Sequence, residues 1–443
     1  MENIMGTEKI SKLVLKTGLP LMFSLLISSM YNFVDSIFVS HVSENALTAV
    51  SLSSPVQVLV SAFGCGIAVG LNAVVSKALG QKNQTKVKNA TSASFCLGIL
   101  AWIIIAVLAI LFIKPYFIWQ SGGNQEIAEY GIAYLSVCML FSFGQMGQWI
   151  FDRLVIASGK SNLFIFTLSA ASLTNLILDP IFIFGYFGLP AMGTLGAAIA
   201  TVIGQCVGCI AGYIINKKYN KEIPIEFTLH PNLKSMIQIL KVGIPTAIVQ
   251  SISSFVGIFM NSILISFSTT AIAIYGICTK IQNLVLVGVH GIDNGVIPIV
   301  AYNYGANKPA RIKETRKWAT IFSLAIYGIF FIVLEIFTKN ILVIFDASQD
   351  MMNMGVGALR IMSISFYLSH ICLVIAAMLQ GLSLGTKSMY LTMMRQVIFP
   401  FGLVFIFQFF QNINLIWLAF ILAELFTIPI GIYMYNSTMK KMF

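Results

Sequence analysis

Long apolar stretches recur from one end of this 443-residue chain to the other, and they constrain its fold more than any other feature. Many exceed the ~18 residues that indicate a membrane-spanning helix. Because lipid offers no partner for free backbone N–H and C=O groups, spanning segments are helices or closed barrels. Barrel strands alternate polar and apolar residues, and these stretches do not. The sequence therefore predicts an all-α membrane protein, and its composition of 58% hydrophobic and 10% charged residues agrees.

The apolar stretches divide into twelve predicted transmembrane helices. They lie near 14–39, 47–74, 92–113, 131–152, 162–185, 194–215, 243–266, 272–300, 318–338, 356–379, 388–410 and 415–435. With the amino terminus inside, 22 of the 27 Lys and Arg residues fall in inside segments and 2 in outside loops. This bias indicates an even number of helices with both termini cytoplasmic. We expect a multi-pass protein of the cell membrane, inner or plasma, with the lipid bilayer as its surroundings. Its scattered basic residues predict no nucleic-acid partner.

The two halves of the chain share four glycines and a proline that recur 225 residues later, a separation that we call the repeat offset. The pairs are Gly18 and Gly243, Pro20 and Pro245, Gly66 and Gly291, Gly70 and Gly295, and Gly80 and Gly305. Such self-similarity predicts a duplication of a six-helix unit. Parallel repeats of this kind form two bundles that rock about a central cavity in transporters. We expect an amino-terminal lobe at 1–215, a cytoplasmic linker at 216–240 and a carboxy-terminal lobe at 241–443.

Two acids lie deep inside predicted spans, Asp35 in the first and Asp179 in the fifth. A charge at a helix centre costs about 2.5–3.5 kcal/mol on insertion scales, so each of these acids requires a reason. Asn175 lies four residues before Asp179 and Tyr31 four before Asp35, so each pair shares a helix face. If both faces point inward, one pocket holds two carboxylates, an amide and a phenol.

Two neighbouring carboxylates in a poorly hydrated pocket cannot easily both ionise, so we expect this pocket to bind a proton or a small cation. Pro180 lacks an N–H, which frees the carbonyl of Leu176 as a cation ligand or a hinge. Structural alternatives remain for these residues. Asn175 and Asp179 could simply hydrogen-bond to a neighbouring helix, Asp35 could lie near the outer membrane surface, and Pro20 could be a plain helix-start proline.

The remaining chemistry-bearing residues give weaker patterns. Cys206 and Cys209 have metal-ligand spacing, but neither a second pair nor a nearby histidine completes a site, so we expect no metal and no cofactor. His290 and His370 are expected to be packed and hydrogen-bonded. Methionines and phenylalanines are expected to line part of a greasy substrate cavity. Asp293 is an unexpected acid in the eighth predicted helix, and the sequence pattern does not explain it.

Several motifs together resemble the multidrug and toxic compound extrusion (MATE) family over nearly the whole chain. They are GLP at 18–20, VDSIFVS at 34–40, ENALTAVSLSSP at 44–55, LGQKN at 79–83, NLILDPIFIFG at 175–185, GTLGAAIAT at 193–201 and YNYGANK at 302–308. The resemblance implies twelve helices in two six-helix lobes. It also implies a secondary active transporter, not an enzyme, that exports cationic amphipathic drugs in exchange for H⁺ or Na⁺. We expect such a protein to work as a monomer.

The resemblance also assigns residues. Asp35, Asn175 and Asp179 match the family's amino-lobe cation site, with Tyr31 and Thr201 as neighbours. Tyr31, Asp35 and Asp179 are then expected in the substrate cavity, and Pro20 matches the proline where the first helix bends. Some members of the family carry carboxylates in helices 7 and 10, and the matching stretches here, 248–257 and 366–374, have none.

Other functions remain open from the sequence. A flippase for lipid-linked oligosaccharide or peptidoglycan precursors would need a cationic cavity, for which Lys280, Arg360 and Arg395 are the candidates. An intramembrane aspartyl protease usually carries a GxGD motif, which this sequence lacks. A major-facilitator transporter normally has an acidic–basic glycine motif after helix 2, where this chain reads SKALGQKNQTKVKN.

Overall fold

The computed structural model describes residues 3–225, 232–345 and 348–443, and every regular element in these ranges is a helix. The amino-terminal half contains α1 (Ile4–Thr7), α2 (Ile10–Ser40), α3 (Glu44–Gly80), α4 (Gln84–Gln120), α5 (Gln125–Leu140), α6 (Phe143–Ala157), α7 (Phe164–Phe184) and α8 (Thr194–Tyr219). The carboxy-terminal half contains α9 (Leu233–Leu264), α10 (Thr269–Gly305), α11 (Pro309–Ile344), α12 (Gln349–Gly381), α13 (Gly385–Met393), α14 (Phe399–Phe407) and α15 (Ile413–Met442). The prediction of an all-α fold is confirmed.

Eleven of the described segments are long and apolar enough to cross a membrane, and α5 with α6 forms a twelfth if the bent pair is counted as one span. The sequence predicted one continuous helix over 131–152, which is wrong. The chain bends by 47° between Leu140 and Phe143. The backbone N–H of Ser142 donates to the carbonyl of Met139, three residues back, so the α-helical pattern tightens and stops there.

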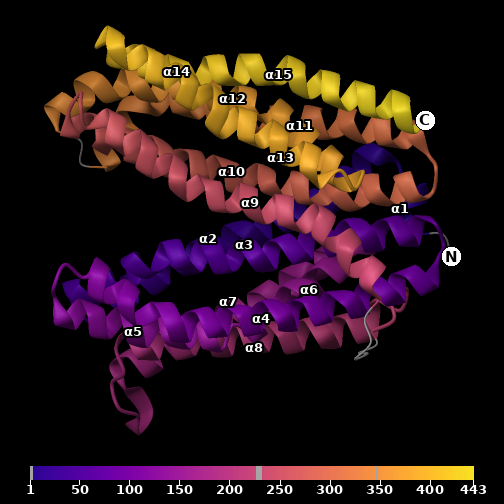
Figure 1. The fold of residues 1–443 in the computed structure, drawn as a ribbon, viewed down its shortest axis with the longest axis horizontal. Helices are drawn as coiled ribbons and strands as arrows, with labels where there is room; N and C mark the ends of the chain where they lie inside the picture. The colour runs from indigo at the N-terminus through magenta and orange to yellow at the C-terminus, as the bar shows by residue number, and fades with distance from the viewer. Residues whose placement is uncertain (1–2, 226–231, 346–347) are drawn as a thin grey trace.

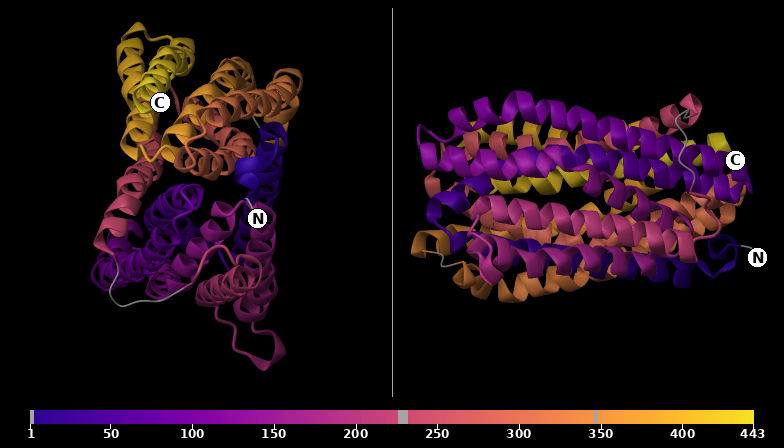
Figure 2. Two further views of the ribbon diagram at one scale, coloured as in Figure 1. Left: turned by 90° about the vertical axis from the view of Figure 1, so that its right-hand side faces the viewer. Right: turned by 90° about the horizontal axis from the view of Figure 1, so that it is seen from below.

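The helices form two groups that follow the two halves of the chain (Figure 1). Seen along the helices, α2–α8 form one group and α9–α15 the other (left view of Figure 2). Both termini lie at the same end of the molecule, which we call the terminal face (Figure 1). The predicted linker 216–240 overlaps helices at both ends, because α8 continues to Tyr219 and α9 begins at Leu233. Residues 226–231 of that linker lie outside the described ranges.

The repeated glycines lie where the two lobes touch, a contact that we call the lobe seam. A Cβ atom at Gly66 of α3 would lie 2.6 Å from the carbonyl oxygen of Gly243 in α9. A Cβ at Gly80 would lie 2.0 Å from the carbonyl oxygen of Tyr302, and one at Gly305 would lie 2.1 Å from that of Lys77. Lys77 and Tyr302 are themselves related by the repeat offset, so each of the two contacts is the repeat copy of the other. Only glycine lets the backbones approach this closely.

The second long helix of each repeat also begins with an equivalent helix cap. The Ser43 side chain accepts a hydrogen bond from the N–H of Ala46 and caps α3. The Ser268 side chain, at the equivalent position of the second repeat, accepts one from Ala271 and caps α10 in the same way. Such caps satisfy a backbone donor that the helix itself leaves free. Local sequence therefore sets the register of α3 and α10 identically in the two lobes.

Residues at the amino terminus tie the lobes together at the terminal face. The Asn3 amide donates to the carbonyl of Ser158 at 3.1 Å and to Glu222 at 2.6 Å, both in the amino-terminal half. Arg311, at the start of α11, donates to the carbonyl of Met5 at 3.1 Å. The lobes are thus joined at this end by hydrogen bonds as well as by the glycine contacts, and they diverge toward the other end (Figure 1).

Candidate functional site

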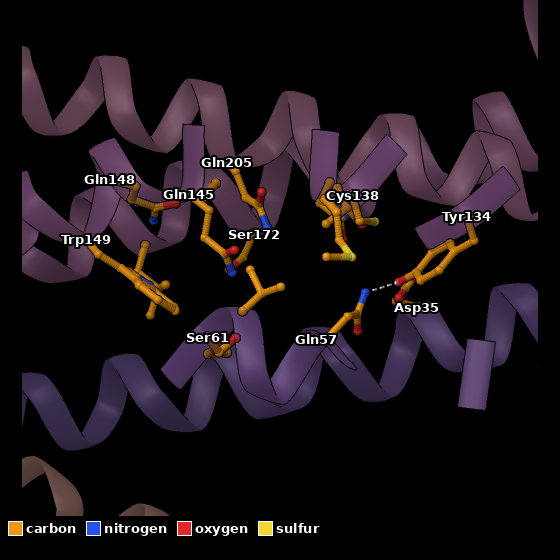
Figure 3. Close-up of a pocket in the computed structure, with 17 residues that line it drawn as sticks. Asp35, Gln57, Ser61, Tyr134, Cys138, Gln145, Gln148, Trp149, Ser172 and Gln205 are labelled. Carbon is orange, nitrogen blue, oxygen red and sulfur yellow. Dashed lines mark hydrogen bonds between the residues drawn. The ribbon is translucent and has the colours of Figure 1, made fainter. Parts of the chain in front are cut away.

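A cavity of about 310 Å³ lies inside the amino-terminal lobe (Figure 3). Six helices, α2, α3 and α5–α8, supply its walls. Its lining consists of Ser28, Asp35, Gln57, Val60, Ser61, Tyr134, Cys138, Met139, Gln145, Gln148, Trp149, Leu168, Ala171, Ser172, Asn175, Thr201 and Gln205. Most of these side chains are polar but uncharged, which is unusual for a pocket surrounded by apolar helices. A cavity of this size is at the lower end of the range that holds small molecules.

Amide side chains dominate the polar part of this wall. Gln57, Gln145, Gln148 and Gln205 point into the cavity from three helices (Figure 3). The Gln57 amide donates to the hydroxyl of Tyr134 at 3.2 Å. A primary amide offers both donors and an acceptor, so these residues can adapt to ligands of different shapes without a fixed charge.

The structure brings the two predicted acids together. Asp35 of α2 and Asp179 of α7 lie within hydrogen-bonding reach of one another. Asp35 is half-buried and lines the cavity, whereas Asp179 is fully buried and lies behind the lining. Two carboxylates this close repel one another when both are ionised, so the pair favours a bound positive charge, either a proton or a small cation.

Asn175 and Thr201 complete the group around Asp179. The Asn175 amide donates to Asp179 at 3.2 Å and to the hydroxyl of Thr201 in α8 at 3.3 Å. Glycine makes this approach of α8 to α7 possible, because a Cβ at Gly204 would lie 2.7 Å from the carbonyl oxygen of Ala171. The i, i+4 spacing of Asn175 and Asp179 does place both side chains on one helix face, as the sequence predicted.

Three buried oxygens in this group have no hydrogen-bond partner in the described structure. They are Oδ1 of Asp35, Oδ2 of Asp179 and Oδ1 of Asn175. Unpartnered buried acceptors are costly, and a bound cation or proton satisfies them. The arrangement can therefore bind a single positive charge at the wall of the cavity. Tyr31, the fourth residue predicted here, has a side chain outside the described part of the structure.

Neither predicted hinge proline interrupts its helix. Pro20 lies inside the continuous helix α2, where its carbonyl accepts a hydrogen bond from the hydroxyl of Ser24 at 2.8 Å. Pro180 lies inside α7, which continues to Phe184 before Gly185 ends it in a left-handed conformation. Each proline removes one backbone hydrogen bond from its helix, although both helices are continuous in this structure. Each helix is therefore easier to bend at its proline than elsewhere.

Sequence reasoning missed most of the cavity wall. Of the methionines and phenylalanines, a minority of which were expected to line a substrate cavity, only Met139 belongs to the lining given above. A signal was present in the sequence, because all four glutamines lie inside predicted apolar spans. Asp152 of α6 was also missed. It is buried and accepts a hydrogen bond from Thr167.

The basic residues considered for a flippase lie apart from the cavity of the amino-terminal lobe. Arg395 is buried in the carboxy-terminal lobe and pairs with Glu424 at 2.9 Å. Arg360 pairs with Glu335 at 3.5 Å, and Lys280 is exposed. None of the three basic side chains lines the cavity of Figure 3. The two histidines also differ from one another: His370 is buried and hydrogen-bonded to the carbonyl of Tyr367, as expected, whereas His290 is exposed.

Comparison with known proteins gives a consistent result. The model of the MatE family matches the chain twice, over residues 20–181 and 245–406, and the two matches are again separated by the repeat offset. The multidrug export protein MepA of Staphylococcus aureus strain MSSA476 is 26% identical over 419 residues, which cover 93% of this chain and 90% of MepA. MepA of Staphylococcus haemolyticus strain JCSC1435 is 26% identical over 382 residues, which cover 85% of this chain and 83% of that protein.

Solved structures share the whole fold. A multidrug resistance MATE family transporter of the MOP superfamily, described in an outward-facing conformation, superimposes with a TM-score of 0.90 at 22% identity. The match covers 100% of this chain and 98% of that one. A MOP superfamily transporter from Pyrococcus furiosus gives a TM-score of 0.90 at 21% identity over 99% of this chain and 98% of that one. At this level of identity the likeness establishes the fold.

Proposed function

Because this chain belongs to the MatE family of membrane transporters, we propose that it exports amphipathic cationic compounds from the cell in exchange for H⁺ or Na⁺. One observation carries the proposal: Asp35 and Asp179 meet beside a polar cavity, with three buried oxygens that have no hydrogen-bond partner in the described structure. A transporter of this family is not an enzyme, which removes the protease alternative. The relatives named as multidrug export proteins support a drug substrate.

The proposed exchange depends on competition for one negative site. A proton shared by Asp35 and Asp179, or a Na⁺ held by their free oxygens with Asn175, neutralises the site and lowers its attraction for a cationic drug. When the light ion leaves, the carboxylates attract a lipophilic cation into the cavity. Coupling requires only that the two ligands prefer different conformations of the lobes. The glutamines then supply contacts that tolerate varied drugs.

We propose that the terminal face is cytoplasmic and that the membrane is the plasma membrane. The positive-inside distribution of Lys and Arg supports this orientation. The described lobes are joined at the terminal face by the glycine seam and the Asn3 and Arg311 hydrogen bonds, so this arrangement is closed toward the cytoplasm. Since one chain contains both lobes and the whole cavity, we propose that it works as a monomer.

The deciding experiment measures uptake of ethidium into inside-out proteoliposomes under separately imposed H⁺ and Na⁺ gradients. We expect uptake under at least one gradient, and we expect Asp179→Asn to reduce it to the level of empty liposomes. Glu129→Gln, at an exposed position of α5, is the matched control and should keep full uptake. Undiminished uptake by Asp179→Asn would remove the acid pair from the mechanism, and no uptake under either gradient would reject the exchange.

A further inference from the structure

A second group of buried ionisable side chains lies in the carboxy-terminal lobe, away from the cavity. It consists of Asp293 of α10, Arg395 in the π-helical turn at Met394–Ile398, and Glu424 of α15. The Arg395 guanidinium donates to Glu424 at 2.9 Å, and both side chains are about 5% exposed, at 5% and 6%. Asp293 is 7% exposed and lies close enough to Arg395 for direct electrostatic attraction. We call these three residues the carboxy-lobe triad.

The charges of this triad do not balance. One guanidinium faces two carboxyl groups, so the triad carries a net negative charge if both acids are ionised. Arg395 and Glu424 neutralise one another through their hydrogen bond, which leaves Asp293 as the unmatched acid. A buried unmatched carboxylate is strongly disfavoured, whereas a protonated carboxyl group is not. The triad becomes neutral when it holds a single proton.

Three polar atoms of the triad and its neighbour Tyr327 are buried without a hydrogen-bond partner among the described residues. Oδ1 of Asp293, Oε2 of Glu424 and the hydroxyl of Tyr327 are buried and have no hydrogen-bond partner in the described structure. All three side chains are more than nine-tenths buried. Unpartnered buried polar atoms on three helices around Arg395 require an explanation, and a bound proton supplies one.

Other ionisable groups surround the triad on the neighbouring helices. Tyr327 of α11 and Cys372 of α12 both interact electrostatically with Arg395 and Glu424. The His370 ring of α12 lies 6.1 Å from the ring of Tyr327. His290, one turn before Asp293 on α10, is exposed, and its interaction with Arg395 is a repulsion between cations when it is protonated. Asp293 is therefore the acid on α10 that faces a fixed positive charge.

The backbone that carries Arg395 is itself irregular. Residues 394–398 form a π-helical turn, and Pro400 follows it after one intervening residue. A proline inside an α-helix disturbs the regular hydrogen bonding, because it has no N–H and its ring collides with the carbonyl four residues earlier. A π-turn relieves this conflict, and such turns are frequent at functional sites. The irregular turn rotates Arg395 into the lobe.

The triad is connected to the lobe seam through α10. Gly291 and Gly295 face α2, where a Cβ would lie 2.4 Å from the N atom of Met22 and 2.9 Å from the hydroxyl of Thr17, respectively. Asp293, midway between the two glycines, therefore lies on the opposite face of α10. The next residue, Asn294, accepts a hydrogen bond of 2.7 Å from Arg153 of the amino-terminal lobe. A charge change at Asp293 thus occurs one residue from a contact between the lobes.

We propose that the carboxy-lobe triad is a second proton-binding site, which takes up and releases one proton in each transport cycle and acts through α10 on the contact between the lobes. The inference rests on the proposed exchange function and adds to it one exchanged proton in each transport cycle. A metal ion fits the triad poorly, because Arg395 already supplies a positive charge. Moreover, within the described ranges no group of three His, Cys, Asp or Glu residues could hold a metal ion.

The test measures the steady-state accumulation of tetraphenylphosphonium in proteoliposomes at zero membrane potential. A Na⁺ gradient and a pH gradient of about one unit are imposed alone and together. Each exchanged proton multiplies the accumulation ratio by about tenfold per pH unit. We expect Asp293→Asn to lower the ratio under the pH gradient by about tenfold relative to the wild type. Glu335→Gln, which removes a half-exposed carboxylate of α11, should leave it unchanged.

A second measurement separates a proton site from a structural acid. Exchange of labelled for unlabelled drug without any gradient should remain measurable in Asp293→Asn and should depend less on pH than in the wild type, whereas Glu335→Gln should keep the wild-type rate and pH dependence. Loss of this exchange would overturn the inference, as would an accumulation ratio that responds to pH as in the wild type. A wild type that responds only to Na⁺ would overturn the inference and leave the proposed exchange standing. A wild type that responds to neither gradient would reject the proposed exchange itself.

Discussion

The two lobes share one fold but place their buried acids in opposite settings. In the amino-terminal lobe, Asp35 and Asp179 lie against each other at the wall of a cavity. In the carboxy-terminal lobe, Asp293 and Glu424 share an arginine inside the packed core. One pair therefore offers a free negative site to a ligand, whereas the other already has a fixed counter-ion.

The duplication makes this difference informative. The repeat partners of Asp35 and Asp179 in the second lobe are Met260 and Val404, which are buried apolar residues of the carboxy-lobe core. Conversely, the repeat partner of Asp293 in the first lobe is Ala68, a buried residue of α3. The seam glycines occur in both lobes, but the charges do not. The glycine contacts between the backbones are thus retained in both copies of the repeat. Each buried acid, in contrast, occurs in only one copy and has an apolar residue at the equivalent position of the other.

The largest expected effect on stability comes from Glu424→Gln. Glu424→Gln removes the carboxylate that is hydrogen-bonded to the buried Arg395 and leaves only Asp293, which makes no such bond in the described structure, so we expect the free energy of unfolding in detergent to fall by about 3–5 kcal/mol. Thermal unfolding of the purified protein measures this. Glu335→Gln at the half-exposed pair with Arg360 should cost less than about 1 kcal/mol. Equal losses for the two variants would contradict the buried role of the Arg395 pair.

A smaller loss in the free energy of unfolding is expected at the glycine contacts of the lobe seam, which occur in both copies of the repeat. Gly80→Ala places a methyl group against the carbonyl of Tyr302, and we expect a loss of about 1–3 kcal/mol from overpacking. Gly305→Ala should cost a similar amount, because its contact with Lys77 is the repeat copy. Gly402→Ala, with no atom within 4 Å, is the control and should be neutral or stabilising. Unequal losses at Gly80 and Gly305 would show that the seam is not symmetric.

We expect Asp35→Asn to abolish uptake but to change the free energy of unfolding less than Glu424→Gln or Gly80→Ala does. An asparagine keeps a hydrogen bond to Asp179 and removes the repulsion between two acids, so we expect the free energy of unfolding to remain within about 1 kcal/mol of the wild type or to rise. Thermal unfolding with and without drug checks this. A loss as large as that of Glu424→Gln would mean that the two acid pairs are equivalent after all.

The smallest effect is expected at the amide wall of the cavity. Gln205→Ala should raise the KM for ethidium about three- to tenfold, with little change in the maximal rate, because it removes a substrate contact and no charge. Initial rates of uptake measure this. Ile110→Ala on α4, where the side chain is 72% exposed, is the control and should leave the KM unchanged. An unaltered KM in Gln205→Ala would place the drug outside this part of the cavity.

Much of the fold followed from the sequence because lipid permits few solutions. An apolar segment that crosses a membrane is a helix, so hydropathy alone located eleven spans and the bent pair that adds a twelfth. The fixed offset of the glycines predicted a duplication, and the family match repeats at the same offset. The spacing of Asn175 and Asp179 predicted a shared helix face. The family resemblance, stated from motifs, is confirmed by the match to the MatE family.

What the sequence could not give is the rotation of each helix about its own axis. In a soluble helix an apolar stripe identifies the buried face, but here apolar residues surround most helices, so no stripe distinguishes lipid from core. The pairing of Arg395 with Glu424 and the four glutamines at one cavity therefore emerge only when the helices pack. Local sequence and lipid determined the helices and the repeat, whereas contacts between helices distant in the chain decided which polar groups meet, because only packing fixes the direction in which each side chain points.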